Sequence, residues 1–82
     1  MISTVEELVS LVEECAATVL PQGRLNAEFS PRTNLRGLAR DSLNLLELVT
    51  EVEDRLEIHL PNDELVVIVT IQDLWLAIER NR

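Results

Sequence analysis

The sequence predicts an all-α fold: a four-helix bundle with a long loop between the first and second helices and a short third helix. Two observations lead to this prediction. Three long segments place apolar residues at helical spacing, whereas residues 21–40 show no sustained period. The apolar fraction of 46% comes mostly from Leu, Val, Ile and Ala, which suits layers of small aliphatic side chains between helices.

The first helix is expected over residues 4–20. Its apolar residues form one stripe: Val5, Leu8, Val9, Val12, Ala16 and Val19. Two pairs with the spacing of a capping box mark its start: Ser3 with Glu6, and Thr4 with Glu7. Pro21 and Gly23 end it.

Residues 21–40 carry Pro, Gly and Asn at short intervals, so we expect a loop of about 20 residues there. Loops of this length are uncommon in compact domains unless their own apolar residues tie them down. Four such residues are available: Leu25, Phe29, Leu35 and Leu38. We therefore expect the loop to pack on the bundle.

The second helix is expected over residues 41–58, beginning with Asp41 and Ser42 and stopping before Pro61. Its core-facing stripe contains Leu45, Leu48, Val49, Val52 and Leu56. The opposite face joins two leucines to a column of acidic and polar residues: Leu43, Leu46, Glu47, Thr50, Asp54 and Glu57. A charged helix face is usually only a solvated surface, but the leucines on this one favour a docking site.

The third segment, residues 62–69, is expected to be a short helix or irregular turn. Its run from Leu65 to Val69 has the propensity of a strand, but a single strand has no partner to pair with. The last helix is capped by Thr70 with Asp73 and ends near Arg80. Its inward stripe contains Ile71, Leu74, Trp75 and Ile78.

The charge balance limits the possible partners. Fifteen acidic residues against seven basic ones give a net charge of −8, a field that repels nucleic acids and anionic membrane surfaces. The same field attracts proteins with basic patches, so we expect protein partners, no nucleic acid and no membrane. The lone Cys15 is expected to be a buried structural residue, and with no signal peptide or apolar span in the sequence we expect the cytoplasm.

Ser42 is the residue best placed for chemistry, because the start of a helix favours an attached phosphate. It is a poor candidate for a catalytic nucleophile. The single His59 would lie about 25 Å away, at the far end of the same helix. His59 has no second His or Cys beside it, so we predict no metal site and no hydrolase.

Residues 38–43, LARDSL, resemble the LGxDSL signature of acyl and peptidyl carrier proteins. The resemblance continues through Glu47-Leu48-Val49, Leu60-Pro61 and the cap at residues 70–73, with the spacing of bacterial fatty-acid carriers. A lone Asp-Ser-Leu would more often be an ordinary helix start, but the longer match favours the acyl-carrier type of bundle. We expect residues 1–82 to form one such domain, an independent protein and not an excised piece.

The resemblance implies that a phosphopantetheinyl transferase attaches 4′-phosphopantetheine from coenzyme A to Ser42. The thiol of the arm would hold acyl groups as thioesters, and the protein, expected to be a monomer, would itself catalyse nothing. Acyl-loading and acyl-processing enzymes with basic docking patches would be the partners. Family contact positions match Asp41, Leu43, Asn44, Leu46, Glu47, Thr50, Glu53 and Asp54.

Three residues depart from the pattern: Ala39 replaces the usual Gly, Arg40 adds a positive charge, and Asn44 stands where Asp is common. Arg40 and Asn44, together with the bulky apolar third segment, favour a carrier of a specialised polyketide or lipid pathway. Housekeeping fatty-acid synthesis and aminoacyl or peptidyl transfer are the alternatives within the class. The alternative of another class is an unmodified protein-interaction module that uses the Leu43 and Leu46 face.

Overall fold

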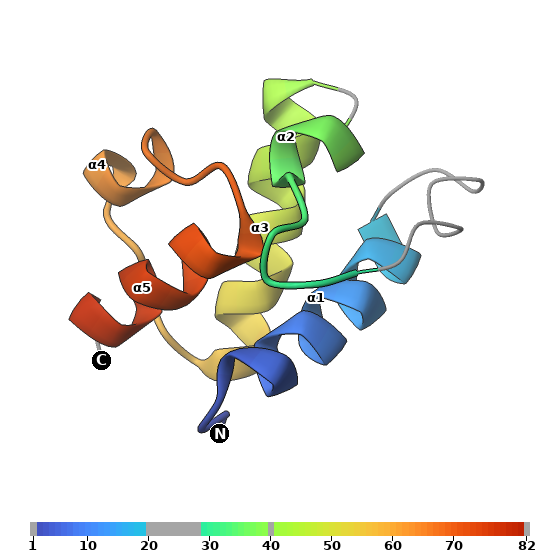
Figure 1. Ribbon diagram of the computed structural model, residues 1–82. Coiled ribbons are helices and arrows are strands. Elements are labelled where there is room, and N and C mark those ends of the chain that lie inside the picture. The colour runs from blue at the N-terminus through green and yellow to red at the C-terminus, as the bar shows by residue number, and fades with distance from the viewer. Residues whose placement is uncertain (1, 20–28, 40, 82) are drawn as a thin grey trace.

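The computed structural model describes residues 2–19, 29–39 and 41–81. Over these ranges the chain forms helices and no strand: α1 (Val5–Val19), α2 (Leu35–Leu38), α3 (Ser42–Leu56), α4 (Asn62–Leu65) and α5 (Ile71–Asn81). In Figure 1, α3 runs down the middle of the view, with α1 on one side and α4 and α5 on the other. The predicted all-α fold with a short third helix is confirmed. The one addition is α2, a single turn within the segment predicted to be loop.

The core lies where α1, α3 and α5 meet. Most residues of their predicted inward stripes are buried, including Leu8 and Val12 of α1 and Leu48 of α3, while Val5, Val19 and Leu45 are partly buried. Segments outside these three helices add Leu35, Leu60 and Ile68 to the same core. Trp75 is only partly buried, and Ala77 occupies a buried position of α5 that the predicted stripe omitted. None of the described helices combines the length and the apolar character needed to cross a bilayer.

Capping boxes begin α1 and α5 at the predicted places. The Glu7 N–H donates to Thr4 Oγ1 at 3.2 Å, and Glu7 Oε1 accepts from the Thr4 N–H at 3.1 Å. The second predicted pair at this end does not form a box, because Ser3 N–H also donates to Glu7. At α5, Asp73 and Thr70 exchange the same two bonds.

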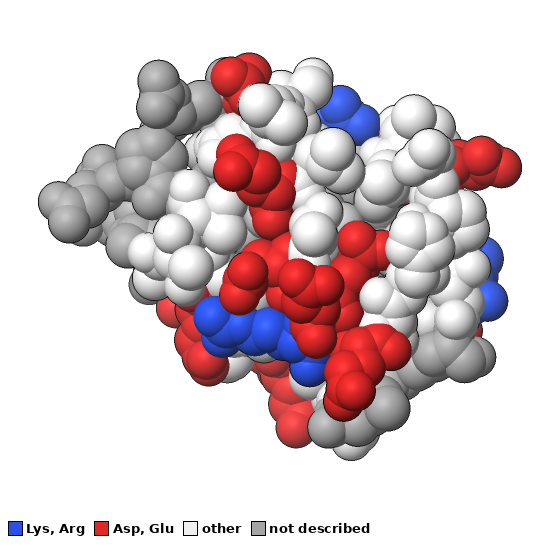
Figure 2. Space-filling view, turned by 180° about the vertical axis from the view of Figure 1, so that it is seen from behind, with Lys and Arg blue, Asp and Glu red and all other residues white. Residues whose placement is uncertain are grey.

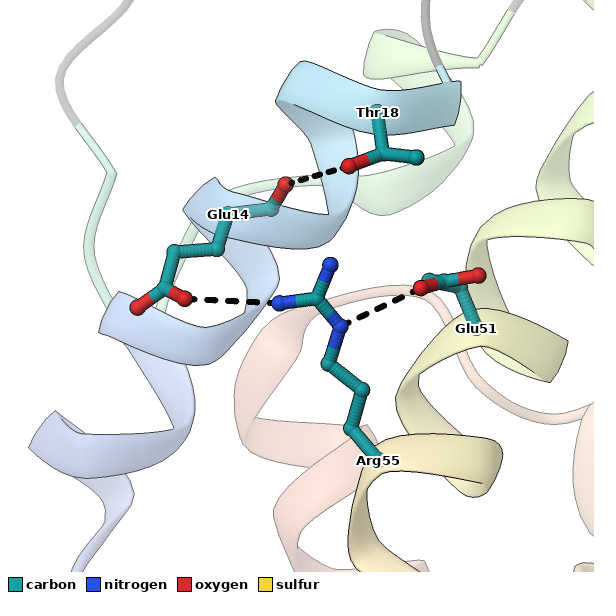
Figure 3. A network of polar contacts seen from close by, with 4 residues as sticks. All are labelled: Glu14, Thr18, Glu51 and Arg55. Atoms are coloured by element: carbon teal, nitrogen blue, oxygen red, sulfur yellow. Dashed lines mark hydrogen bonds and ion pairs between the residues drawn. The ribbon is translucent and has the colours of Figure 1, made fainter.

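Arg55 joins α3 to α1 on the surface (Figure 3). Its Nη1 lies 3.3 Å from Glu14 Oε1, and its Nε lies 3.1 Å from Glu51 Oε2 on the preceding turn of α3. On the α1 side, Thr18 Oγ1 donates to the Glu14 carbonyl oxygen at 3.3 Å. Exposed ion pairs add little to stability, so the apolar contact between the two helices carries most of their association.

The long loop packs on the bundle in its described part. Leu35 and Leu38 are buried and Phe29 packs against the core, as predicted, whereas Leu25 lies outside the described residues. Backbone bonds hold this segment against the start of α5: Leu35 N donates to Val69 O at 2.7 Å and Ile71 N to Thr33 O at 3.1 Å. These bonds fix α2, and with it the approach to Ser42.

Leu60 and Ile68 bury the two ends of the segment after α3, but α4 itself depends on polar contacts more than on burial. No residue of α4 is buried. Arg80 of α5 holds it from one side, with Nη2 2.7 Å from Glu64 Oε1. Val66 and Val67 follow α4 with exposed fractions of 71% and 59%, so these apolar residues face outward and do not fill the bundle.

The end of α3 is shaped by two glutamates. Glu57 adopts the left-handed conformation, φ 56° and ψ 44°, and its N–H donates to the Asp54 carbonyl oxygen. Glu53, one turn earlier, is buried and its Oε2 accepts from the backbone N–H of Leu60. That bond folds residues 58–60 back against the helix and starts the connection to α4.

Candidate functional site

Ser42 is the first residue of α3, and its side chain is exposed. Asp41 precedes it in extended conformation and caps the helix, because its Oδ1 accepts from Asn44 N at 2.8 Å. The change from extended chain to helix places Ser42 on a corner of the molecule. The Ser42 hydroxyl has no hydrogen-bond partner among the described residues, so its esterification breaks no bond to that part of the chain.

The geometry fits an attached phosphodiester. The first N–H groups of a helix lack partners in the preceding turn, and the helix dipole adds a positive potential there. Ala39, which replaces the family glycine, has φ −78°, a conformation open to any residue, so the extra methyl group introduces no backbone strain. Arg40 lies outside the described residues, and its predicted effect on the local charge stays a prediction.

A groove of about 290 Å³ opens beside Ser42, between α3 and the α4 segment. Its walls are mainly apolar and include Leu45 and Val49 from α3, and Leu65 and Ile68 from the α4 side. Leu65 and Val66 of the bulky third segment line the groove and Val67 does not, and about 290 Å³ remains open beside the serine. The groove is of the size and character that accepts a flexible, largely apolar chain.

The outer side of α3 carries an exposed surface that we call the docking face. It consists of Asp41, Leu43, Leu46, Glu47, Thr50 and Asp54. Leu43 and Leu46 are 67% and 45% exposed and line the same hollow of the surface, and apolar side chains grouped in this way favour an interaction site. Figure 2 shows Asp and Glu side chains gathered across the middle of the molecule's rear face, with a band of Arg among them.

Comparisons with known proteins agree with this geometry. Residues 10–78 match the family described as "Phosphopantetheine attachment site". The acyl carrier protein of Helicobacter hepaticus is 33% identical over 72 residues, which cover 85% of this chain and 95% of that protein. The chain belongs to the phosphopantetheine-binding acyl carrier family. The acyl carrier protein of the diatom Phaeodactylum tricornutum is 39% identical over 46 residues, 56% of this chain and 60% of that protein.

Family membership establishes the role of acyl carrier and 4′-phosphopantetheine as the group the chain takes. No solved structure matches this carrier. The residue that bears the arm and the residues that contact partners are not identified by these matches.

The structure contradicts the exposed position that was expected for Glu53. Its side chain points inward to Leu60, with only 9% of the residue exposed, and is already bonded within the fold. We therefore exclude Glu53 from the docking face. Asn44 is half-buried and its N–H is used in the cap of α3, so it lies at the edge of that face.

Two features near the site were absent from the sequence prediction. A second groove of about 340 Å³ runs along the docking face and includes Val19 of α1 and Glu51 of α3. Arg36 of α2 lines the groove beside Ser42. Each feature is formed by residues from separate helices, which sequence patterns within one helix do not reveal. Only Glu51 had a local signal, because it lies one turn after Glu47.

His59 is remote from Ser42, as predicted. It follows the end of α3 with its side chain 90% exposed, and its Nδ1 lies 3.7 Å from Glu53 Oε2. Over the described ranges, 2–19, 29–39 and 41–81, no three His, Cys, Asp or Glu residues are grouped so that they could hold a metal ion.

Proposed function

We propose that Ser42 carries the phosphopantetheine arm, and that residues 1–82 act as one carrier domain that catalyses no reaction itself. The main support for this proposal is the exposed Ser42 hydroxyl at the start of α3, which lies inside the family match and beside an apolar groove. When bound, the arm supplies a thiol that holds acyl groups as thioesters. A tethered acyl group reaches each partner's active site at a high effective concentration.

The partners we propose are a phosphopantetheinyl transferase and acyl-loading and acyl-processing enzymes that present basic patches to the docking face. A net charge of −8 supports this choice, because it accelerates encounter with basic surfaces at low salt. Leu43 and Leu46 would provide the apolar centre of the contact. We expect a monomer, and the lone Cys15, which has no internal disulfide partner, supports the cytoplasm.

Two exposed leucines allow a matched test of the docking face. Leu46 is 45% exposed on α3, and Leu76 is 44% exposed on α5. We expect Leu46→Ala to raise the KM of the transferase for this carrier while Leu76→Ala leaves it unchanged, with both variants retaining the parent's thermal stability. Equal KM values for the two variants would show that the transferase does not contact the docking face at Leu46.

The pathway we propose is a specialised polyketide or lipid pathway. Support comes from Arg40 and from Asn44 in place of the common Asp, which change the charge of the sequence around Ser42. Further support comes from the exposed valines after α4, which alter a surface that housekeeping enzymes would meet. Housekeeping fatty-acid synthesis and aminoacyl transfer are the alternatives. Each predicts a different cargo.

The test is to offer the arm-bearing protein to purified malonyl, long-acyl and aminoacyl loading enzymes, with Ser42→Ala as control. We expect malonyl loading that requires Ser42, at a lower kcat/KM with a housekeeping transferase than a standard fatty-acid carrier gives. Aminoacyl loading alone would refute the pathway. Unchanged function of Ser42→Ala in its native pathway would instead support an unmodified interaction module.

A further inference from the structure

Arg36 is held in place by two backbone carbonyl groups. Its Nε donates to Ile68 O at 3.1 Å, and its Nη2 donates to Val66 O at 3.0 Å. A guanidinium has five N–H donors, arranged so that two edges can each bind a pair of oxygens. The bonds to the carbonyls use one edge, which leaves the Nη1 side without a partner among the described residues.

Arg36 also differs from Arg55 and Arg80, the other arginines that bridge elements, in its ion pairing. Arg55 is paired with Glu14 and Glu51, and Arg80 with Glu64. No carboxylate of the described residues lies within ion-pair distance of Arg36. The structure therefore fixes a guanidinium through neutral oxygens and leaves its charge uncompensated within that part of the chain.

Arg36 shares both of its hollows with Ser42. One is the apolar groove of about 290 Å³. The other is a smaller hollow of about 70 Å³, which Arg36 lines together with Ala39, Asp41 and Ser42. The Asp41 carboxylate in this hollow repels a second anion, and a nearby cation would offset that repulsion for a phosphate on Ser42.

We propose that the guanidinium of Arg36 binds the phosphodiester that joins the arm to Ser42. This inference rests on the proposed attachment at Ser42. Arginine matches the paired oxygens of a phosphate with two parallel N–H bonds, and a guanidinium already held in position loses little entropy on binding. Because the same side chain binds Val66 and Ile68, attachment of the arm also tightens the segment between α4 and α5.

The test compares the free and arm-bearing forms of the parent, Arg36→Gln, Arg36→Lys and Arg32→Gln. Arg32 is the matched control, since it belongs to the same loop segment and lines neither hollow. Each protein is treated with coenzyme A, Mg²⁺ and a transferase, and intact mass verifies the attachment. The readouts are the Tm difference between the two forms and the ³¹P chemical shift of the phosphodiester.

In the parent and in Arg32→Gln, we expect the arm to raise Tm by about 5 °C at low salt, with a smaller rise at high salt. Arg36→Gln should lose that rise and shift the ³¹P signal, while Arg36→Lys, which keeps the charge but not the paired donors, should retain part of it. Comparing the two forms of one variant cancels the loss of the carbonyl bonds. If Arg36→Gln fails to fold, the test rests on two other results: a smaller Tm rise in Arg36→Lys than in the parent, and a ³¹P shift of the parent that changes with salt. Absence of both would overturn the role of Arg36.

Equal Tm differences and equal ³¹P shifts in all four proteins would overturn the role of Arg36 while leaving the attachment at Ser42 intact. No added mass on the parent would overturn the attachment itself, and the inference about Arg36 with it.

Discussion

Replacing Glu53 by Ala should destabilise this carrier far more than an exposed glutamate on the same helix would. Glu53 is 9% exposed and accepts a hydrogen bond from the backbone N–H of Leu60, a residue that is 1% exposed. Alanine removes the acceptor without replacing it. The N–H is then left buried without a partner at the point where the chain leaves α3.

The magnitude follows from that unpaired donor. A buried donor that loses its acceptor costs about 1–3 kcal/mol, so we expect a loss of about 2 kcal/mol in the free energy of unfolding. For a domain of this size that corresponds to a fall of roughly 10 °C in Tm. Glu53→Gln keeps an acceptor oxygen and loses only the charge, so it should cost about 1 kcal/mol.

The assay is urea unfolding followed by circular dichroism, together with a thermal scan. Glu47→Ala is the control, because it removes one negative charge from an exposed position of α3 and should change stability by less than about 0.5 kcal/mol. If Glu53→Ala proves as stable as Glu47→Ala, the buried bond to Leu60 does not stabilise the fold and the reasoning is refuted.

Three further predictions concern other parts of the fold. Glu57→Gly should stabilise the protein by about 0.5–1 kcal/mol in urea unfolding, because glycine adopts the left-handed conformation at φ 56° without strain, whereas Glu47→Gly inside α3 should destabilise it by about 0.5 kcal/mol. Burial raises the pKa of the Cys15 thiol, so a thiol reagent at pH 8 should label the native arm-free protein slowly, the unfolded protein fast, and the arm-bearing protein fast at the arm alone. Hydrogen bonds from the backbone N–H groups of Thr70 and Val69 lower the pKa of the Asp73 carboxyl below its ordinary 3.8. The stability from that shift is complete above the unfolded pKa and is lost as the pH falls through the folded one, so Asp73→Asn should flatten the pH dependence of Tm below about pH 4.

The sequence predicted the parts of the fold that depend on local pattern. The stripes of α1 and α3 and the caps at Thr4 and Thr70 involve residues three or four apart, and the structure reproduces them. The misjudged residue was Glu53. The family resemblance implied a partner-contact position there, but the chain turns back after α3 and places a backbone donor against the carboxylate.

The residues of the candidate site also fall into those that a local pattern predicts and those that depend on distant contacts. Ser42 was predicted because its motif and helix start are contiguous in the sequence. Arg36 was not, because its bonds reach carbonyl groups 30 and 32 residues away, and no local pattern records such a contact. The turn of helix at α2 depends equally on the distant bond between Leu35 and Val69.

The measurement that tests the central claim most directly is localisation of the arm by mass spectrometry. The protein is incubated with coenzyme A, Mg²⁺ and a broad-specificity transferase and cleaved after arginine, which releases residues 41–55 with Ser42 as their single serine. We predict one phosphopantetheinyl group on Ser42 in the parent and none in Ser42→Ala. No added mass with several transferases, or an arm located on another residue, would contradict the account.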